Sequence, residues 1–332
     1  MKKIEYRFRI LSLFFMATLL LTSCSNDDDD DDGNWVDMST FDGSPRSGTA
    51  YFTINDVGYI GAGYDGDDYL NSFWSYDFAG NFWSQKADFL GSERSSAAGF
   101  QVDGTGYIGS GYNETEYELY DFYSYNTGTN TWTQIASLPE TEARRGAVAF
   151  GINGAGYFGT GNDGDNDLKD FWKYTPGTDT WAELEGFGGD KRVNAVTFTI
   201  NDLVYLGTGI SSGSYPTDFW YFDPSTETWT ELLELDEEDD YAITRDNAVA
   251  FNLNGYGYIA TGDRSGATTS VWEYDPSDDT WDDKTSFEGT SREGAVAFTN
   301  GSRAFVGLGK SGTLYLDDLD EFFPFDEYDD ED

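Results

Sequence analysis

The chain has 332 residues, of which 62 are acidic and 19 are basic, and its formal net charge is −43. Nucleic acids and anionic membrane surfaces bind basic patches, so this charge excludes both as direct partners. The sequence contains no histidine, which excludes an imidazole general base, a Ser-His-Asp triad and a histidine-ligated metal. The single cysteine, Cys24, excludes a disulfide within the chain.

Residues 1–23 have the pattern of a secretory signal peptide. Four basic residues within the first nine precede an apolar run over residues 10–21, and this run is too short to span a bilayer comfortably. Its end, LTSC at residues 21–24, resembles the bacterial lipobox, in which the cysteine is lipidated. The resemblance implies a secreted lipoprotein of the bacterial outer membrane that contacts the membrane only through a lipid on Cys24.

An acidic segment follows, SNDDDDDDGN at residues 25–34. Like charges repel one another and bury nothing, so residues 24–33 are predicted to form a lipidated cysteine and a disordered tether. The segment also resembles the acidic export tag of surface lipoproteins in Bacteroidetes-type bacteria. A solubilising tether and a tag for display on the cell surface both remain open.

A repeat of 47 to 53 residues covers the rest of the chain, and each copy begins with an arginine, continues with small residues and reaches a phenylalanine. The six copies are RSGTAYF (46–52), RSSAAGF (94–100), RRGAVAF (144–150), RVNAVTF (192–198), RDNAVAF (245–251) and REGAVAF (292–298). Internal repeats of this length indicate a solenoid or a propeller.

Three further strand signals follow each arginine segment. The first is a glycine-rich strand, such as GYIGAG at residues 58–63. The second is an aromatic strand, expected at residues 73–77, 122–126, 171–175, 219–223, 271–275 and 322–326. The third is opened by a tryptophan at 83, 132, 181, 229 and 281. Four short strands in about 50 residues describe one blade of a β-propeller.

The sixth repeat has no tryptophan strand of its own. Trp35 heads a matching segment at the other end of the chain, residues 34–45. We therefore expect the N-terminal strand to pair as the outer strand of the last blade, which closes the ring and removes an exposed edge. The propeller is predicted to span residues 34–328, followed by an acidic tail at 329–332.

The order of an arginine with small residues, a strand that ends in glycines, a Tyr-Asp strand and a Trp strand resembles the kelch repeat. The resemblance implies an all-β, six-bladed kelch-type β-propeller with four strands per blade. The glycines depart from the kelch doublet, because they read Gly-x-Gly and Ala260 replaces the first glycine in one repeat.

One arginine per blade is expected to face the mouth of the central channel. In kelch domains that bind peptides or sugars, arginines at this position reach the ligand. The resemblance therefore nominates six candidate ligand-binding residues, Arg46, Arg94, Arg144, Arg192, Arg245 and Arg292. A structural role is the alternative, because a guanidinium can donate to carbonyls and carboxylates near the axis. Arg145 is additional to the repeat and is expected to point to solvent.

The loops around the mouth are rich in acids and tyrosines. Asp163, Asp165 and Asp167 alternate as calcium ligands do, although the loop lacks the full spacing of an EF-hand, and acid-rich surface turns are the alternative. No other cofactor is expected. Loop tyrosines such as Tyr64 and Tyr112 are candidates for stacking on sugar rings.

The sequence contains no recognisable catalytic set. We therefore expect a monomeric, non-catalytic binding or scaffold protein, anchored by lipid at the bacterial cell envelope, whose propeller mouth binds a glycan or a protein partner. The alternative is a carbohydrate-active kelch enzyme such as a sialic acid mutarotase-like epimerase. A copper oxidase is excluded, because the site of that family needs histidines and a cysteine cross-linked to tyrosine.

Overall fold

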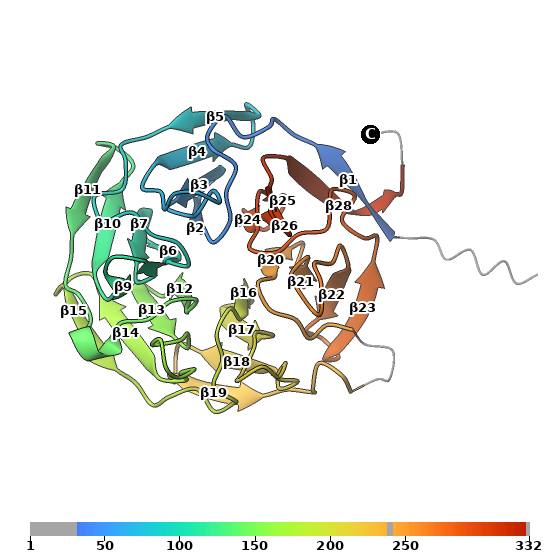
Figure 1. The fold of residues 1–332 in the computed structure, drawn as a ribbon. Coiled ribbons are helices and arrows are strands. Elements are labelled where there is room, and N and C mark those ends of the chain that lie inside the picture. Colours follow the sequence, from blue (N-terminus) through green and yellow to red (C-terminus); the bar gives the residue numbers. More distant parts are fainter. Residues whose placement is uncertain (1–31, 238–241, 330–332) are drawn as a thin grey trace, which may run out of the picture. The chain divides into compact units, whose positions relative to one another are not determined.

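The computed structural model describes residues 32–237 and 242–329. The predicted signal peptide, Cys24 and most of the predicted tether lie outside the described residues. The described part forms six four-stranded antiparallel sheets around a central axis, as Figure 1 shows. Its helical content is a single 3-10 turn, η1 (Glu140–Glu142). In these ranges no helix has the length and hydropathy needed to cross a bilayer.

The blades follow one another along the chain, and in blades 1 to 5 the strands run in chain order from the axis outward. Blade 1 contains β2 (Ala50–Ile54), β3 (Val57–Gly61), β4 (Phe73–Asp77) and β5 (Phe82–Gln85). Blade 2 contains β6 (Ala98–Val102), β7 (Thr105–Gly109), β10 (Phe122–Asn126) and β11 (Thr131–Gln134). Blade 3 contains β12 (Val148–Ile152), β13 (Ala155–Gly159), β14 (Phe171–Thr175) and β15 (Thr180–Glu183).

Blades 4 and 5 have the same order, and blade 6 takes its outermost strand from the N-terminus. Blade 4 contains β16 (Val196–Ile200), β17 (Leu203–Gly207), β18 (Trp220–Asp223) and β19 (Thr228–Glu231). Blade 5 contains β20 (Val249–Leu253), β21 (Tyr256–Ala260), β22 (Val271–Asp275) and β23 (Thr280–Lys284). Blade 6 contains β24 (Val296–Thr299), β25 (Ala304–Gly307), β28 (Leu319–Glu327) and β1 (Asp32–Asp37). Two short hairpins, β8 (Tyr112–Asn113) with β9 (Tyr117–Glu118) and β26 (Lys310–Ser311) with β27 (Leu314–Tyr315), project from blades 2 and 6.

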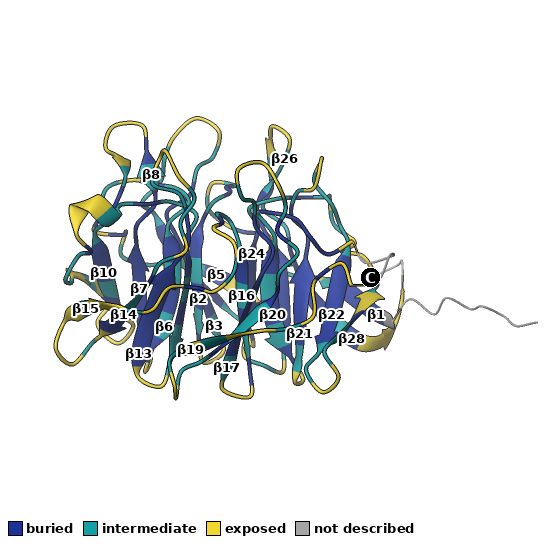
Figure 2. Ribbon diagram, turned by 90° about the horizontal axis from the view of Figure 1, so that it is seen from below, coloured by how far each residue is buried: buried dark blue, intermediate teal, exposed yellow. Residues whose placement is uncertain are grey.

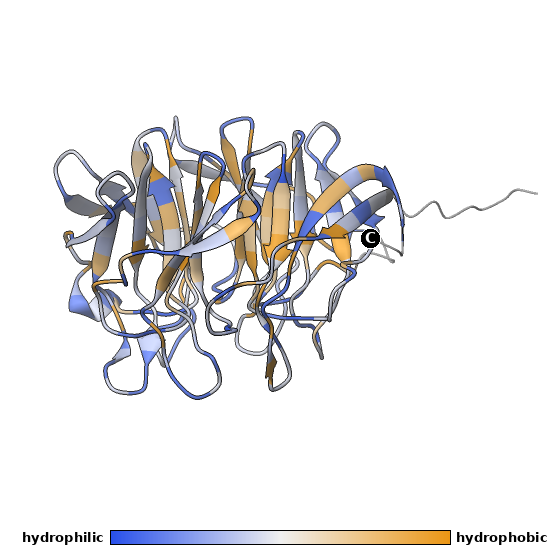
Figure 3. Ribbon diagram, turned by 90° about the horizontal axis from the view of Figure 1, so that it is seen from above, coloured by the Kyte–Doolittle hydropathy of each residue, from blue (hydrophilic) through white to orange (hydrophobic). Residues whose placement is uncertain are grey.

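The core lies between the blades. Figure 2 shows buried strands between exposed loops at both faces, and Figure 3 shows that the hydrophobic residues follow the strands. Each apolar cluster joins side chains of adjacent blades, as when Phe122 of blade 2 packs against Phe158 of blade 3 with ring centroids 5.1 Å apart. Both faces of a blade are buried in this way, which explains why the strands carry aromatic residues without a strict apolar and polar alternation.

The residue opposite on the adjacent strand determines whether the first position of the Gly-x-Gly motif must be glycine. A methyl group on Gly109 would stand 2.1 Å from the ring of Phe122, with which Gly109 is paired. In blade 5 the equivalent pair is Ala260 with Val271. Because Val271 has no ring at this point, the alanine is accommodated there, and the departure from the kelch pattern leaves the blade intact.

Polar contacts join the outer edges of the blades. The hydroxyl of Tyr125 on β10 donates to Asn130 Oδ1 at 2.7 Å, and the same oxygen accepts the backbone N–H of Ala87 from blade 1 at 2.9 Å. The indole of Trp132 donates back to the Ala87 carbonyl at 3.0 Å. Blade 3 repeats the arrangement with Tyr174 and Asp179. The repeated Tyr and Trp positions thus bind each outer strand to the preceding blade.

The predicted closure of the ring by the N-terminal strand is confirmed. Strand β1 pairs antiparallel with β28, and Trp35 lies opposite Phe322, as Trp83 lies opposite Tyr76 in blade 1. Trp35 is 1% exposed and stacks on Phe322 with ring centroids 4.5 Å apart. Closure therefore places both ends of the described chain in one blade.

The predicted third strand of blade 6, residues 322–326, lies within β28, but its alignment with the repeat was wrong by three residues. Gly307 pairs with Leu319, as Gly61 pairs with Phe73 in blade 1, so the equivalent segment is 319–323. Asp320 consequently occupies the position of Trp74. The aromatic letters of FFPFD matched the repeat by composition, but the hydrogen-bond register follows the chain from the arginine segment.

Asp320 is buried opposite Asp37 across the closing strand pair. Burial raises the pKa of Asp320 to about 8; Asp37 adds to the rise through a hydrogen bond and its charge, Asp318 adds through its charge, and Arg292 opposes it. The pKa of an aspartate in the unfolded chain is about 3.9. Because the folded pKa of Asp320 is higher, its stabilisation of the folded state is fully present below the unfolded pKa and is lost as the pH rises through about 8. Closure is therefore weakest in alkaline solution.

We predict that Asp320→Asn removes this loss, because an amide does not ionise. The melting temperature of the wild type should fall between pH 5 and pH 9 more than that of the variant. At pH 9 the variant should melt higher by at least ~3 °C. Calorimetric scans across this range test the prediction, with Asp326→Asn, an exposed carboxylate on the same strand, as the control. Parallel pH profiles for wild type and Asp320→Asn would contradict it.

Candidate functional site

The six repeat arginines, which we call the arginine anchors, are all buried. Each of Arg46, Arg94, Arg144, Arg192, Arg245 and Arg292 is 0% or 1% exposed. The central channel is lined by neighbouring residues of the same segments and not by the anchors. The expectation that the guanidinium groups face the channel is therefore wrong, although one anchor does lie at the same end of every blade. Direct ligand binding by the anchors stays a prediction.

The anchor side chains donate to the same backbone carbonyls in every blade. In blade 2, Arg94 Nε donates to the carbonyl of Ser92 at 2.8 Å, and Nη1 donates to that of Ser110 at 3.0 Å. Ser110 is the middle residue of the Gly-x-Gly motif and has a φ of 58°. The anchor therefore stabilises the tight turn after the glycine strand, where a left-handed residue directs its carbonyl inward.

Four anchors also form an ion pair with an aspartate that precedes the aromatic strand. Arg94 donates to Asp121 at 2.6 and 3.0 Å, and Arg144 donates to Asp170 at 2.7 and 2.8 Å. Burial raises the pKa of Asp121, but the hydrogen bond and charge of Arg94 outweigh it and hold the pKa below its usual value. Arg192 pairs with Asp218 and Arg292 with Asp318 in the same way.

Blades 1 and 5 have no such aspartate. There Arg46 and Arg245 donate to the carbonyls of Ser72 and Ser270. Burial without a carboxylate partner lowers the pKa of both guanidinium groups to about 10. Even so, both remain charged at neutral pH, and their charge is satisfied by backbone carbonyls alone.

Backbone hydrogen bonds around the anchors form two closed rings. In the first, the second glycine of each Gly-x-Gly motif donates to the anchor carbonyl of the next blade, from Gly63 to Arg94 at 2.8 Å through to Gly309 and Arg46 at 2.9 Å. These glycines have φ between 88° and 108°, which an L side chain rarely adopts. The ring therefore requires glycine at that position.

The second ring is formed two residues after each anchor. Here the backbone N–H of one blade donates to the carbonyl of the preceding blade, with distances of 2.7 to 3.3 Å, until Gly48 donates to Gly294 and closes the circle. All six residues are left-handed, with φ between 51° and 63°. We call this ring the collar, and its members are Gly48, Ser96, Gly146, Asn194, Asn247 and Gly294.

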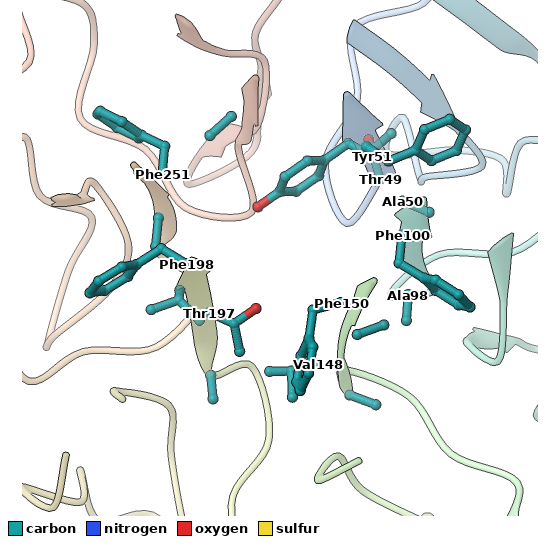
Figure 4. A pocket seen from close by; sticks show the side chains of 18 of the residues that line it. Thr49, Ala50, Tyr51, Ala98, Phe100, Val148, Phe150, Thr197, Phe198 and Phe251 are labelled. Atoms are coloured by element: carbon teal, nitrogen blue, oxygen red, sulfur yellow. The ribbon is translucent and has the colours of Figure 1, made fainter. Parts of the chain in front are cut away.

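The collar surrounds one end of the central channel, which has a volume of about 340 Å³. Tyr51 projects into the channel where the other blades have Gly99, Ala149, Thr197, Ala250 and Ala297. Figure 4 shows the ring of Tyr51 reaching across the channel space, while the rings of Phe100 and Phe198 point away into the blades. Burial raises the pKa of Tyr51 to about 12, so its hydroxyl stays neutral. The channel is narrowed from one blade only.

Above the collar, the residue after each anchor and the residue after each Gly-x-Gly motif exchange both of their backbone hydrogen bonds. These mouth pairs are Ser47 with Tyr64, Ser95 with Tyr112, Arg145 with Asn162, Val193 with Ile210, Asp246 with Asp263, and Glu293 with Lys310. The backbone is the same in each blade, but the side chains differ. The mouth is therefore chemically asymmetric, and the chemistry for recognising a ligand gathers at these positions.

One side of the mouth carries five tyrosines in successive contact, which we call the tyrosine row: Tyr315, Tyr64, Tyr69, Tyr112 and Tyr117. Neighbouring ring centroids lie 6.1, 5.0, 6.0 and 6.5 Å apart along the row. Tyr117 is 63% exposed, and the other four are partly exposed. The row crosses the loops of blades 6, 1 and 2, so it joins residues that are far apart in the sequence.

Arg145 was expected to point to solvent, and its side chain is partly exposed but also makes two contacts at the mouth. Its guanidinium lies 4.9 Å from the centroid of the Tyr112 ring and 3.3 Å from Glu118. The side chain remains 39% exposed. Arg145 thus extends the tyrosine row into blade 3 and is available at the surface, whereas the neighbouring Arg144 is buried.

The opposite side of the mouth is acidic. Asp246 of blade 5 is 9% exposed and accepts hydrogen bonds from Asn194 and Asn247. Burial raises its pKa, and the charges of Asp263 and Glu293 raise it further, although the hydrogen bond from Asn194 opposes the shift. A largely buried carboxyl with a raised pKa at a channel mouth is a candidate for a functional group.

Two of the three calcium candidates, Asp163 and Asp167, have other partners for their carboxylates. Asp163 accepts the backbone N–H groups of Asp165 and Asn166 at 2.9 and 2.6 Å. Asp167 accepts Asn162 Nδ2 at 2.8 Å and the backbone N–H of Ser212 at 2.7 Å. Among residues 32–237 and 242–329, no three His, Cys, Asp or Glu side chains gather as metal ligands. In this loop two of the three carboxylates, Asp163 and Asp167, serve to fix turns.

The adjacent Arg144 and Arg145 allow a matched test of the anchor role. Arg144→Ala removes donors to Asp170, Glu142 and the buried Thr160 carbonyl, which should cost ~2–3 kcal/mol. Arg145→Ala removes a partly exposed ion pair with Glu118 and should lower the free energy of unfolding by at most ~1 kcal/mol. Chemical denaturation of both variants measures this difference. Equal losses of stability in the two variants would refute the anchor role.

Comparisons with known proteins agree with this architecture. A family model described as the KLHDC2/KLHL20/DRC7 Kelch-repeats domain matches residues 91–237. The solved structure titled "Structure of YjhT" superposes with a TM-score of 0.72 at 17% sequence identity, over 85% of this chain and 95% of that chain. No curated protein matches the chain. The six four-stranded blades and this structural likeness show that the chain is a six-bladed β-propeller, and the family model identifies kelch repeats over residues 91–237.

Proposed function

We propose that this propeller is a monomeric, non-catalytic carbohydrate-binding module whose ligand docks on the tyrosine row. The observation that carries the proposal is the continuous contact of five tyrosines across three blades at the channel mouth. A tyrosine offers a flat apolar face and a polar hydroxyl. A sugar ring offers the complement, since its axial C–H groups form an apolar face and its hydroxyls lie around the rim.

The placement of the row favours binding over a structural role. The rings lie on loops and short hairpins, outside the apolar clusters between the blades. Aromatic residues left partly exposed in a contiguous group mark interaction surfaces. The two closed backbone rings hold the loops at their bases, so a ligand meets a surface whose backbone is already ordered.

The row can be tested by removing one ring and then only its hydroxyl. Tyr112→Ala should weaken binding of a glycan selected on a glycan array by at least ~10-fold, because Tyr112 contacts both Tyr69 and Arg145. Tyr112→Phe keeps the ring and removes only the hydroxyl, so its affinity for the glycan should fall less than that of Tyr112→Ala. Isothermal titration calorimetry measures the affinities. Phe325→Ala removes an aromatic residue that is 67% exposed and lies outside the row, so it should bind as the wild type does.

Two results would count against the proposal. Binding that is unaffected by Tyr112→Ala places the ligand elsewhere. Accelerated exchange between the anomers of the bound sugar, seen by NMR and lost in Asp246→Asn, would instead favour the carbohydrate-active alternative, a mutarotase-like epimerase. The raised pKa of Asp246 at the mouth is the observation on which that alternative depends.

We also propose that the module is held at the outer membrane of a bacterium by a lipid on Cys24. The support is the sequence LTSC after an apolar run and before an acidic segment. When the full chain is expressed in a bacterium that lipidates its own lipoproteins, labelled palmitate should be incorporated into the wild type and lost in Cys24→Ala. Equal labelling of both would remove the lipid anchor from the proposal.

A further inference from the structure

Beside the tyrosine row, the loops of blades 1 and 2 enclose a hollow of about 420 Å³. Tyr64 and Tyr69 form part of its wall, and five of its ten lining residues are acidic, while none is basic. We call it the tyrosine–acid hollow. Its acidic residues are Asp67, Asp68, Glu93, Glu114 and Glu116.

The walls of the hollow are fixed by internal hydrogen bonds. In blade 1, Asp65 Oδ1 accepts the backbone N–H groups of Asp67 and Asp68 at 3.0 and 2.8 Å. In blade 2, Asn113 Oδ1 accepts those of Thr115 and Glu116 at 2.9 and 2.7 Å. These contacts hold the backbone of both loops in place. The backbone of the hollow is therefore preformed, so a ligand does not have to order its loops.

Most of the carboxylates in the hollow have no cationic partner in the described chain. Asp67, Asp68 and Glu114 are exposed and form no ion pair. The guanidinium of Arg94 in blade 2 is fully buried and bonded to Asp121. Arg145 approaches from blade 3, where it is paired with Glu118. The hollow therefore presents a net negative field to solvent.

Aromatic faces next to unpaired carboxylates are the surroundings that an ammonium group prefers. The ring face of a tyrosine attracts a cation, and carboxylates within a few ångströms add Coulomb attraction. An anionic group would meet five carboxylates here and is disfavoured. The surroundings raise the pKa of Tyr64, through partial burial and then through the charges of Tyr315, Glu114 and nearby aspartates, so this phenol stays neutral.

A second hollow on the same face shows that this chemistry is local. It lies between the loops of blades 3 and 4, with a volume of about 390 Å³, and is lined by Asp165, Asp167 and Lys191 among others. It contains no aromatic side chain, and a lysine offsets its acids. Similar loops thus build hollows of different chemistry, and the second hollow provides a matched control.

We infer that the tyrosine–acid hollow binds the ammonium group of an amino sugar. The inference rests on the proposed function, since it takes the sugar ring on the tyrosine row as given and assigns the charge of the ligand. Tyr69 connects the two, because it lines the hollow and contacts Tyr112 in the row. A sugar stacked on the row can therefore place a substituent in the hollow.

The test compares two ligands that differ only in this group, a glucosamine tetrasaccharide and its fully N-acetylated form. The glucosamine oligomer should bind the full propeller at least ~10-fold more tightly at low salt, and salt should reduce this preference. The double substitution Asp67→Asn with Glu114→Gln should remove the preference and leave binding of the acetylated oligomer unchanged. Asp165→Asn in the second hollow should have no effect on either ligand.

The outcomes separate this inference from the proposed function. Equal affinity for both oligomers, with loss of both in Tyr112→Ala, would overturn the amino-sugar inference and leave the tyrosine row as a glycan site. Failure of both oligomers, together with binding of a lysine tetrapeptide that depends on Asp67 and Glu114, would assign the hollow to a basic peptide and overturn the inference as well. A preference for glucosamine that survives the double substitution would place the ammonium outside the hollow.

Discussion

The propeller depends on one buried arginine in each blade and on the charge that it brings into the interior. A guanidinium has five donors and stays charged, so burying it is tolerated only where acceptors surround it. The turn after the glycine strand supplies these acceptors through a left-handed residue whose carbonyl points at the anchor, as Ser110 does for Arg94. The anchor's own carbonyl then accepts from the preceding blade. The side chain thus orders its own blade, and the backbone joins that blade to its neighbour.

Because the ring is held by the anchors and by backbone hydrogen bonds, the side chains at the mouth can differ from blade to blade. The anchors, the Gly-x-Gly motifs and the collar all form hydrogen bonds with backbone groups, and these backbone groups are the same in each blade. The mouth pairs lie directly above this ring with their backbone hydrogen bonds already made, so their side chains contribute little to the stability of the ring. Tyrosines, an arginine, two aliphatic residues and a cluster of carboxylates occupy equivalent positions as a result. The asymmetry of the mouth is where recognition of one ligand over another can develop.

Blade 6 shows which contact is lost when the ring is closed by the two ends of the chain. It is assembled from both ends of the chain, and it keeps the aromatic contact of Trp35 with Phe322 that holds the outer strand. It does not keep the large aromatic residue of the third strand, where Asp320 stands opposite Asp37. A buried carboxyl at that point is stable mainly in its protonated form. The closing blade is therefore the part of the ring whose stability responds most directly to pH.

The sequence by itself determined the architecture, because a repeat of about 50 residues with four strand signals is compatible with few folds and because Trp35 had no other place in the pattern. It did not determine the register of β28, since the aromatic letters of residues 322–326 resemble the repeat while hydrogen bonding follows the strand from Leu319. It also could not decide where the arginines point. Their acceptors lie 2, 16 and about 26 residues away in the chain, and only the closed ring brings these groups around the guanidinium. The tyrosine row and the hollow joined to it likewise depend on blades 6, 1 and 2 becoming neighbours, which the tertiary structure alone decided, because contact between them requires the ring to close.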